Sequence, residues 1–163
     1  MSGIDSLVGG SGRWKGTYRL LEPSRPLQQS HSVASVTPVI GERFVRIDYT
    51  WSYDGEPQEG SLLCGYDRKR RVVVAAWIDS WHMGDKFMSC EGTVSKNGTI
   101  DVSGSYSVQS SPDWGWRTVI EATKADTLRM VMYNVSPDGK EELAVEATFS
   151  KARTSTKRGR SAS

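Results

Sequence analysis

The sequence contains few residues of the kinds that bind metals. Its 163 residues include two cysteines and two histidines, and no CxxC, HxH or HExxH motif occurs. A structural zinc site needs four such ligands, and any other metal site would need carboxylates to complete it. No Ser-His-Asp or paired-carboxylate arrangement stands out either. We therefore expect no metal, no cofactor and no recognisable catalytic set.

Long apolar segments are also missing. No stretch approaches the roughly 20 apolar residues of a membrane-spanning helix, and the N-terminus lacks the apolar stretch of a secretory signal. We therefore expect a cytoplasmic protein that does not contact a membrane. Cys64 and Cys90 are then expected to be free thiols, because disulfides are rare in that compartment. The strands that would carry them lie two apart, at about 9–10 Å, which is beyond the reach of a disulfide.

Helical periodicity is nearly absent, and most of the chain has the alternating pattern of β-strands. Only residues 4–8, between Ser2 and the pair Gly9-Gly10, could form a helical turn. Turn signals such as Asp54-Gly55 and Asn97-Gly98 separate the other segments. The expected strands cover approximately residues 13–22, 28–39, 43–53, 59–66, 71–81, 87–95, 99–108, 116–123, 128–135 and 142–150.

Ten strands joined mostly by short turns indicate an antiparallel up-and-down barrel that closes on itself. A two-sheet sandwich is the alternative, but it usually needs longer connections than these turns allow. Interior width grows with strand number, and a barrel of about eight strands can already hold a small ligand. We therefore expect an all-β barrel of about ten strands with an internal cavity.

The net charge of +2 conceals an asymmetry between the two parts of the chain. Residues 151–163 carry five basic residues and no acidic one, so the first 150 residues have a net charge of −3. This tail contains no aliphatic residue larger than alanine, which predicts a disordered segment. We expect a barrel domain over residues 1–150 and a disordered basic tail over 151–163. Since the body is acidic and shows no RNA-binding motif, we do not expect the tail to contact nucleic acid.

Several motifs resemble a known group of barrel proteins. The string Gly12-Arg13-Trp14-Lys15-Gly16 resembles the Gly-x-Trp signature that opens lipocalin-like and fatty-acid-binding-like barrels, the calycins. Longer strings resemble a bacterial family of uncharacterised calycin-like proteins, over nearly the whole chain up to about Phe149; they are residues 43–49, 77–83, 113–117 and 132–135. The resemblance implies the calycin-like barrel and supplies no activity, because that family has no settled function.

The first motif is also similar to the Gly-x-Trp-x-Gly start of nitrobindin-like haem barrels. Those proteins bind haem through a histidine on a late strand near the C-terminus, and the last two expected strands contain none. His31 and His82 lie on early and middle strands instead. We therefore do not expect haem to bind through that ligand.

Residues 77–82 form the segment with the clearest chemical content. On a regular strand, Trp77, Asp79 and Trp81 share one face, and His82 lies on the other. One interpretation is a pocket in which two indole rings enclose an apolar or planar ligand while Asp79 holds its polar end. The alternative is a core carboxylate hydrogen-bonded to a tyrosine, tryptophan or arginine.

The register of the next strand bears on this pocket. If the turn centres on Gly84-Asp85, Asp79 faces Cys90 and Trp81 faces Met88. Cys90 could act as a nucleophile only if a basic partner lowered its pKa, and a buried inert thiol is the alternative. His82 could act as a general acid or base near Asp79, but the odd spacing would require a bulge.

Two arginines and one tyrosine complete the candidate ligand-binding residues. Arg46 shares a strand face with Asp48, and the two form either an exposed ion pair or a ligand-orienting pair inside the barrel. Arg117 could bind a ligand carboxylate inside the barrel or face solvent. Tyr133 comes from the last of the family-like motifs.

Three functions remain open after this reading. The favoured one is binding of a small, largely apolar ligand inside the barrel, through Trp77, Asp79, Trp81, His82, Cys90, Arg46, Arg117 and Tyr133. The second is an enzyme on the same barrel that uses Asp79, His82 or Cys90. The third is a structural or interaction module, such as a homodimer formed through the apolar outer face of the strand that contains Ile78.

Overall fold

The computed structural model describes residues 3–152 of the chain. One short helix, α1 (Asp5–Gly9), precedes ten strands. The strands are β1 (Gly12–Leu20), β2 (Gln28–Val39), β3 (Phe44–Tyr53), β4 (Glu56–Asp67), β5 (Val72–Asp79), β6 (Met88–Val94), β7 (Ile100–Tyr106), β8 (Trp114–Lys124), β9 (Thr127–Val135) and β10 (Glu141–Lys151). Within these residues no helix is long and apolar enough to cross a lipid bilayer.

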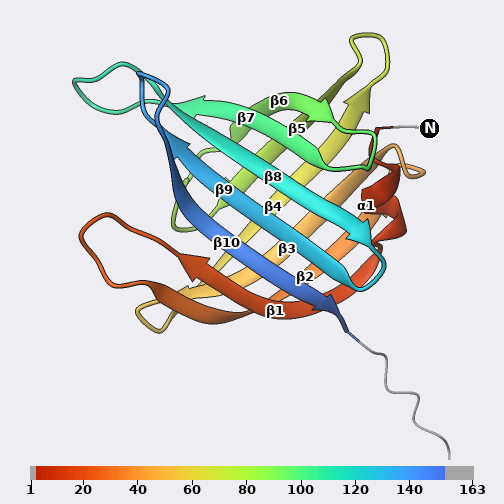
Figure 1. Cartoon of the computed structure of the whole chain (residues 1–163), viewed down its shortest axis with the longest axis horizontal. Helices are drawn as coiled ribbons and strands as arrows, with labels where there is room; N and C mark the ends of the chain where they lie inside the picture. Colours follow the sequence, from red (N-terminus) through yellow and green to blue (C-terminus); the bar gives the residue numbers. More distant parts are fainter. Residues whose placement is uncertain (1–2, 153–163) are drawn as a thin grey trace, which may run out of the picture.

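The ten strands form one closed antiparallel barrel (Figure 1). Each strand pairs with its neighbours in sequence, and β1 closes the barrel by pairing with β10 from Trp14 opposite Lys151 to Leu20 opposite Val145. Among residues 3–152, closure therefore leaves no unpaired sheet edge. The predicted all-β barrel of about ten strands, with a short helical turn at its start, is therefore confirmed.

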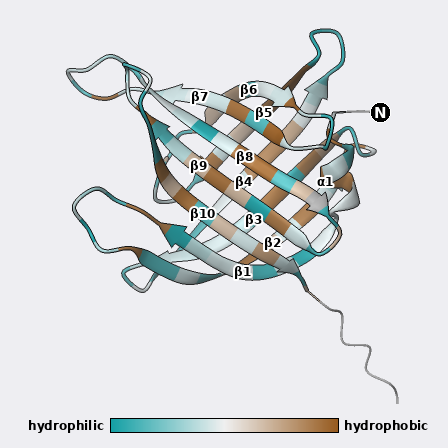
Figure 2. Cartoon of the chain, in the orientation of Figure 1, coloured by the Kyte–Doolittle hydropathy of each residue, from teal (hydrophilic) through white to brown (hydrophobic). Residues whose placement is uncertain are grey.

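The local sequence explains these elements. Asp54 and Gly55 both have positive φ, at 47° and 81°, as a two-residue hairpin turn between β3 and β4 requires. Along β3, Val45, Ile47 and Tyr49 are buried while the residues between them are more exposed. Figure 2 shows the same alternation of hydrophobic and hydrophilic residues along the strands at the front. This two-residue period places one apolar face of each strand inside the barrel.

The middle of the barrel is filled by side chains. The largest side chains that expose less than 2% of their surface include Trp14, Tyr18, Tyr49, Trp77 and Phe149. Ten strands led us to expect an internal cavity, but large aromatic residues on several strands occupy that space. The pockets formed by the described residues open at the two ends and on the outside of the barrel instead.

The two ends of the barrel differ in what covers them. Ile4 and Leu7, in and beside α1, are 1% exposed and belong to the core, so the helix closes the end at the right of Figure 1. The loops β1–β2, β7–β8 and β9–β10 surround the opposite end, at the left of the figure. We call this opposite end the mouth.

The expected C-terminal tail begins inside the last strand. Lys151 pairs with Trp14, and its ammonium group lies 4.9 Å from the centre of the Trp14 ring. The backbone N–H of Ala152 donates to the carbonyl of Arg13 at 2.9 Å. The domain boundary expected at residue 150 therefore falls within β10, and residues 153–163 of the expected tail lie outside the described residues.

Candidate ligand-binding site

The segment after β5 is a tight turn and does not continue the strand. Oδ1 of Asp79 accepts the backbone N–H groups of Trp81 and His82, at 3.0 and 2.9 Å. The N–H of Met83 donates to the carbonyl of Asp79 at 3.0 Å. An aspartate at the start of a turn commonly binds the following backbone in this way. The expectation that the strand continues to Trp81 is therefore wrong.

This early end of β5 also corrects the predicted cross-strand contacts. Met88 pairs with Trp77, and Cys90 pairs with Ala75. Cys90 was expected opposite Asp79, but the connection between β5 and β6 covers residues 80–87 and is longer than a tight turn at residues 84–85. The register is shifted accordingly, so Cys90 lies deeper in the barrel than Asp79.

The turn brings His82 to the same side as Asp79. Nδ1 of His82 lies 3.0 Å from Oδ1 of Asp79. We expected the two residues on opposite faces, as in a regular strand; the turn, with its i to i+4 hydrogen bond, replaces the bulge that this approach would have required. The side chain of His82 is 8% exposed and that of Asp79 is 0% exposed.

Asp79 is the centre of a buried hydrogen-bond network. Its Oδ2 accepts the hydroxyl of Tyr49 at 2.7 Å and the indole N–H of Trp51 at 3.3 Å. The indole N–H of Trp77 donates in turn to the Tyr49 hydroxyl at 2.9 Å. Burial alone would raise the pKa of Asp79, but the hydrogen bonds and charge of His82 together with the Tyr49 hydroxyl outweigh it, so this pKa is lowered. Asp79 is therefore a carboxylate.

The tyrosine of this network is held in its neutral form. Burial, followed by the nearby Asp79 charge, raises the pKa of Tyr49 well above its usual value. Gly60 lies opposite both residues, paired with Tyr49 on one side and Asp79 on the other. A Cβ atom at position 60 would lie 2.2 Å from the Tyr49 oxygen, so only glycine leaves room for this hydrogen bond.

Four indole rings surround His82. The centres of the Trp81, Trp116, Trp51 and Trp77 rings lie 4.7, 5.3, 5.5 and 5.6 Å from the centre of the imidazole. Trp77 and Trp116 also stack on each other at 5.3 Å. Such distances are those of favourable aromatic pairs. The imidazole therefore sits among aromatic rings at the mouth of the barrel.

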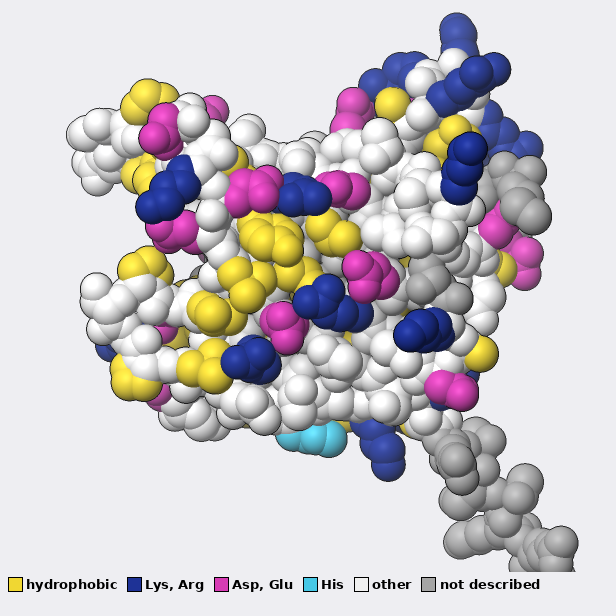
Figure 3. All heavy atoms as spheres, in the orientation of Figure 1, with side chains coloured by type: hydrophobic (Ala, Val, Ile, Leu, Met, Phe, Trp, Pro, Cys, Tyr) yellow, Lys and Arg dark blue, Asp and Glu magenta, His cyan; other side chains and the backbone are white. Residues whose placement is uncertain are grey.

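Two pockets open on these rings. One has a volume of about 660 Å³ and lies between the β5–β6 connection and the end of β7. The other, of about 260 Å³, lies between the end of β1 and the β9–β10 hairpin, where Figure 3 shows a notch in the left side of the surface. Trp81, His82 and Trp116 line both pockets. These three side chains are therefore the shared floor of a site at the mouth.

Polar atoms without partners lie close to this floor. Nε1 of Trp116 and the hydroxyl of Tyr18 are buried and have no hydrogen-bond partner among the residues that the structure describes. Tyr18 stacks on Trp51 with ring centres 4.5 Å apart. Buried polar groups without partners are rare in native proteins, and each calls for an explanation such as an absent ligand or water.

The candidate residues Arg117 and Tyr133 lie on the outside of the barrel. Arg117 binds Asp101 at 2.8 Å and Glu141 at 3.0 Å, and its guanidinium lies 5.3 Å from the centre of the Tyr133 ring. Figure 3 shows acidic and basic side chains mixed on this face. Arg117 and Tyr133 therefore do not line the site at the mouth, because the neighbouring inward positions belong to Trp116 and Thr118 on β8 and to Met132 on β9.

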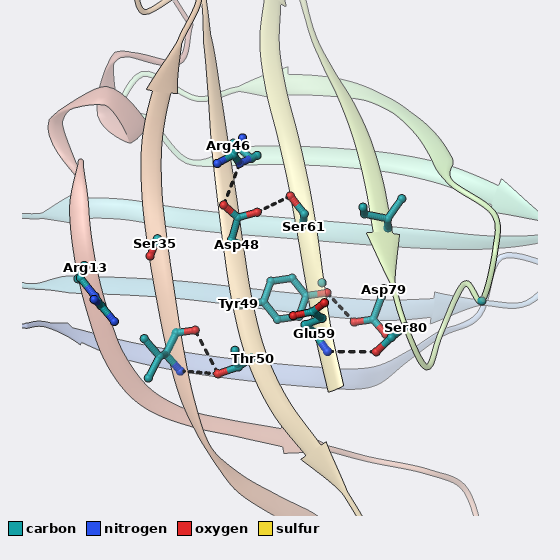
Figure 4. A pocket seen from close by; sticks show the side chains of 14 residues that line it. Arg13, Ser35, Arg46, Asp48, Tyr49, Thr50, Glu59, Ser61, Asp79 and Ser80 are labelled. Atoms are coloured by element: carbon teal, nitrogen blue, oxygen red, sulfur yellow. Dashed lines mark hydrogen bonds and ion pairs between the residues drawn. The ribbon is translucent and has the colours of Figure 1, made fainter. Parts of the chain in front are cut away.

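Arg46 forms part of an outer depression of about 720 Å³ over β2–β5, which Tyr49 and Asp79 also line from below (Figure 4). Its guanidinium binds Asp48 at 2.8 Å, and Asp48 also accepts the hydroxyl of Ser61 at 2.7 Å. Both charged side chains are more than 40% exposed. These polar groups satisfy one another in solvent, so the depression is a less suitable ligand site than the mouth.

The cysteines are buried free thiols, as predicted. Burial raises the pKa of Cys90 to about 11, and burial followed by the nearby Cys90 raises that of Cys64 to about 12. Both remain protonated near neutral pH, which removes the basis for a nucleophilic Cys90. Within residues 3–152 no group of three or more His, Cys, Asp or Glu side chains could hold a metal ion.

The sequence reading missed Tyr49, Trp51 and Trp116 as members of the site. Tyr49 and Trp51 do follow the two-residue alternation of buried positions along β3. Their meeting with Asp79, about thirty positions later in the chain, depends on the register across β4. The sequence did contain one signal for a turn in which a side chain binds the following backbone: Asp79 is followed by the polar residue Ser80.

The comparisons with known proteins place the chain in a family. A family described as "Protein of unknown function (DUF1579)" matches residues 5–151. The chain belongs to the DUF1579 family. This confirms the expected membership of an uncharacterised barrel family. No curated protein matches the chain.

Two solved structures share the fold of this DUF1579 protein. Rv2717c from M. tuberculosis has a TM-score of 0.64 at 13% sequence identity, covering 93% of this chain and 98% of that one. The S-type phycobiliprotein lyase CPES from Guillardia theta has a TM-score of 0.58 at 13% identity, covering 96% and 95%. At this identity the likeness concerns the fold alone.

Proposed function

We propose that this DUF1579 protein binds a small, planar, largely apolar molecule at the mouth of the barrel. The observation that carries the proposal is the shared floor formed by Trp81, His82 and Trp116. Aromatic rings offer a planar ligand large apolar contact and favourable stacking. The volume of about 660 Å³ falls in the range typical of small-molecule sites.

The buried polar groups of the floor support the same proposal. Typical ligand pockets combine an apolar lining with a few polar groups that fix orientation. Here the Asp79–His82 pair provides a polar group that is 8% exposed within an aromatic lining. The structural likeness to a phycobiliprotein lyase is compatible with a functional site on such a barrel.

Two measurements test this function. Native mass spectrometry of protein purified from its own host, followed by organic extraction, is expected to reveal a bound small molecule. Naphthalene then serves as a defined planar probe, with binding followed by NMR titration of the indole N–H signals. Trp81→Ala is expected to weaken naphthalene binding about tenfold, because it removes an aromatic contact of roughly 1–1.5 kcal/mol.

The matched control is Trp14→Phe, which changes a tryptophan near the other end of the barrel. Trp14 lies beside α1, where its indole N–H donates to the carbonyl of Gly10 at 2.9 Å. This variant is expected to bind naphthalene as the unmodified protein does. Equal affinity of the Trp81→Ala variant and the unmodified protein would contradict the proposed site.

A second candidate function follows from the 3.0 Å contact between Asp79 and His82. A carboxylate that orients an imidazole is a common arrangement for a general base. An enzyme would convert the co-purified molecule, and the His82→Gln variant would lose turnover while still binding it. Binding without turnover in the unmodified protein would leave the first function as the better account.

The compartment and the assembly are part of the proposal. A cytoplasmic location is supported by the two free thiols, Cys64 and Cys90. A homodimer through the outer face of β5 is supported by Ile78, which is 51% exposed. Analytical ultracentrifugation of the unmodified protein and the Ile78→Lys variant tests the dimer. Two identical monomer profiles would rule it out.

A further inference from the structure

We infer that the ligand carries a neutral hydrogen-bond donor, such as a phenolic O–H or a lactam N–H, that is recognised by Nε2 of His82. An adjacent acceptor on the same polar group binds the indole N–H of Trp116. This inference rests on the proposed function and specifies the chemistry of the ligand. Asp79 acts in it as a positioning residue.

When the imidazole is uncharged, the Asp79 contact determines which of its nitrogens carries the proton. An ionised carboxylate only accepts hydrogen bonds, so Nδ1 of His82 must donate to it. Nε2 is then the nitrogen with a free lone pair, and it accepts. Within residues 3–152, no hydrogen bond involves this Nε2. The imidazole lines both pockets, so a ligand in either one can reach it.

Trp116 supplies the complementary group. An indole nitrogen can only donate a hydrogen bond. Trp116 is 7% exposed, and its Nε1 atom is buried without a partner among the described residues. Leaving a buried donor unpaired is unfavourable, and a ligand acceptor would remove this cost. The centres of the Trp116 and His82 rings lie 5.3 Å apart and both side chains line the two pockets, so we assign the two hydrogen bonds of one small polar group to them.

The charges around the mouth favour an uncharged polar group. Lys86 lines the larger pocket, whereas Glu22 and Glu142 line the smaller one. These opposite charges lie at separate rims, and among residues 3–152 no buried lysine or arginine on either lining would hold a carboxylate. The hydroxyl of Tyr106 already donates to Asn134 at 2.5 Å. Ser105 and Ser107 also line the larger pocket, but only one pocket, whereas His82 and Trp116 line both, so we assign the polar selection of the ligand to these two.

Three matched probes test the inference on the full-length protein. Naphthalene has no polar group, 1-methoxynaphthalene has an acceptor only, and 1-naphthol has both a donor and an acceptor. At pH 8 we expect 1-naphthol to bind about tenfold more tightly than 1-methoxynaphthalene, the ratio that corresponds to one hydrogen bond. In the His82→Phe variant, which keeps an aromatic ring, the two affinities are expected to become equal.

Two further variants separate the roles of the floor residues. Trp116→Phe removes the indole donor and keeps a ring, so both oxygen-containing probes are expected to lose affinity severalfold while their ratio is unchanged. His31→Phe changes the exposed histidine of β2 and is expected to alter neither the affinities nor the ratio. In the unmodified protein, the Trp116 indole N–H signal is expected to move downfield with 1-naphthol and less with naphthalene.

The outcomes distinguish this inference from the proposed function. Equal binding of 1-naphthol and 1-methoxynaphthalene to the unmodified protein would overturn the inference and leave the aromatic site intact. If none of the three probes bound, the proposed function itself would fail. The probe ratio is measured on the unmodified protein, so the test does not depend on whether the His82→Phe variant folds.

Discussion

The two ends of the barrel are covered by different kinds of groups. At the helical end, Ile4 and Leu7 add apolar side chains to the core. At the mouth, the turn after β5 places His82 among four indole rings and ties it to the buried carboxylate of Asp79. The helical end closes the core with apolar side chains and carries charged residues such as Arg43 and Asp67 only around an outer pocket, whereas the mouth buries a charge, a titratable ring and an unpaired indole N–H.

The mouth is therefore the end at which buried polar groups replace apolar contacts that would stabilise the core. A buried charge must be fully hydrogen-bonded to be tolerated, and Asp79 accepts five hydrogen bonds. A mouth that only had to exclude water could be closed by apolar residues, as the helical end is. Unsatisfied polar groups retained in an aromatic setting are typical of functional sites.

The largest expected effect is the loss of the Asp79 network. The Asp79→Ala variant leaves Tyr49, Trp51 and the turn without their acceptor, so we expect the free energy of unfolding to fall by about 3–5 kcal/mol. Urea unfolding followed by tryptophan fluorescence measures it. The control Asp48→Ala removes an exposed partner of Arg46 and should cost less than about 1 kcal/mol. Similar losses in both variants would contradict the special role of the mouth.

A smaller effect is expected at the helical end. The Leu7→Ala variant removes a fully buried side chain and should lower the free energy of unfolding by about 2–3 kcal/mol. Because α1 lies at the end opposite the mouth, naphthalene affinity should stay the same in the folded variant. NMR titration checks this. A changed affinity would show that the two ends are coupled.

The smallest expected effect is a loss of stability at acidic pH. The pKa of Asp79 is lowered in the folded protein, so the unfolded chain takes up more protons in acid. The contribution is complete above about pH 4, the usual aspartate pKa, and is lost as the pH falls through the lower folded value. Each unit of lowering corresponds to about 1.4 kcal/mol. Urea unfolding between pH 6 and pH 3 measures the loss.

The Asp79→Asn variant and added salt separate the contribution of Asp79 from that of exposed carboxylates in this experiment. The exposed Glu91 also has a lowered pKa, caused first by its hydrogen bond with Arg70. Salt at about 1 M screens such surface pairs much more than buried ones. In high salt, the acid-induced loss should be smaller in the Asp79→Asn variant than in the unmodified protein. Identical losses would mean that Asp79 does not contribute.

The fold was predictable because its signals are local. Two-residue alternation, as along β3, and turn pairs such as Asp54-Gly55 depend only on neighbouring residues. Such signals along the whole chain predicted the number of strands and their antiparallel order. The packed interior was not predictable from strand number alone. It depends on how side chains from distant strands, such as Trp14 and Trp77, share the space.

The site was only partly predictable, because it depends on one turn and one register. The sequence pattern predicts Trp77, Asp79, Trp81 and His82 as the chemically informative segment, and the structure brings these residues together. The predicted strand ran past Asp79, the residue at which β5 ends, so the prediction placed Asp79 and His82 on opposite faces. The partners Tyr49 and Trp51 are fixed by the register across β4, where Gly60 pairs with both Tyr49 and Asp79, and no short-range pattern reveals that register.

The pairing of β1 with β10 has a consequence for the synthesis of the protein. Trp14 pairs with Lys151, so the residues that close the barrel are separated by nearly the whole described chain. Contacts of such long sequence separation form late and slow folding. During translation, the barrel can close only after β10 has left the ribosome, and until then β1 and β9 each expose an edge to other chains.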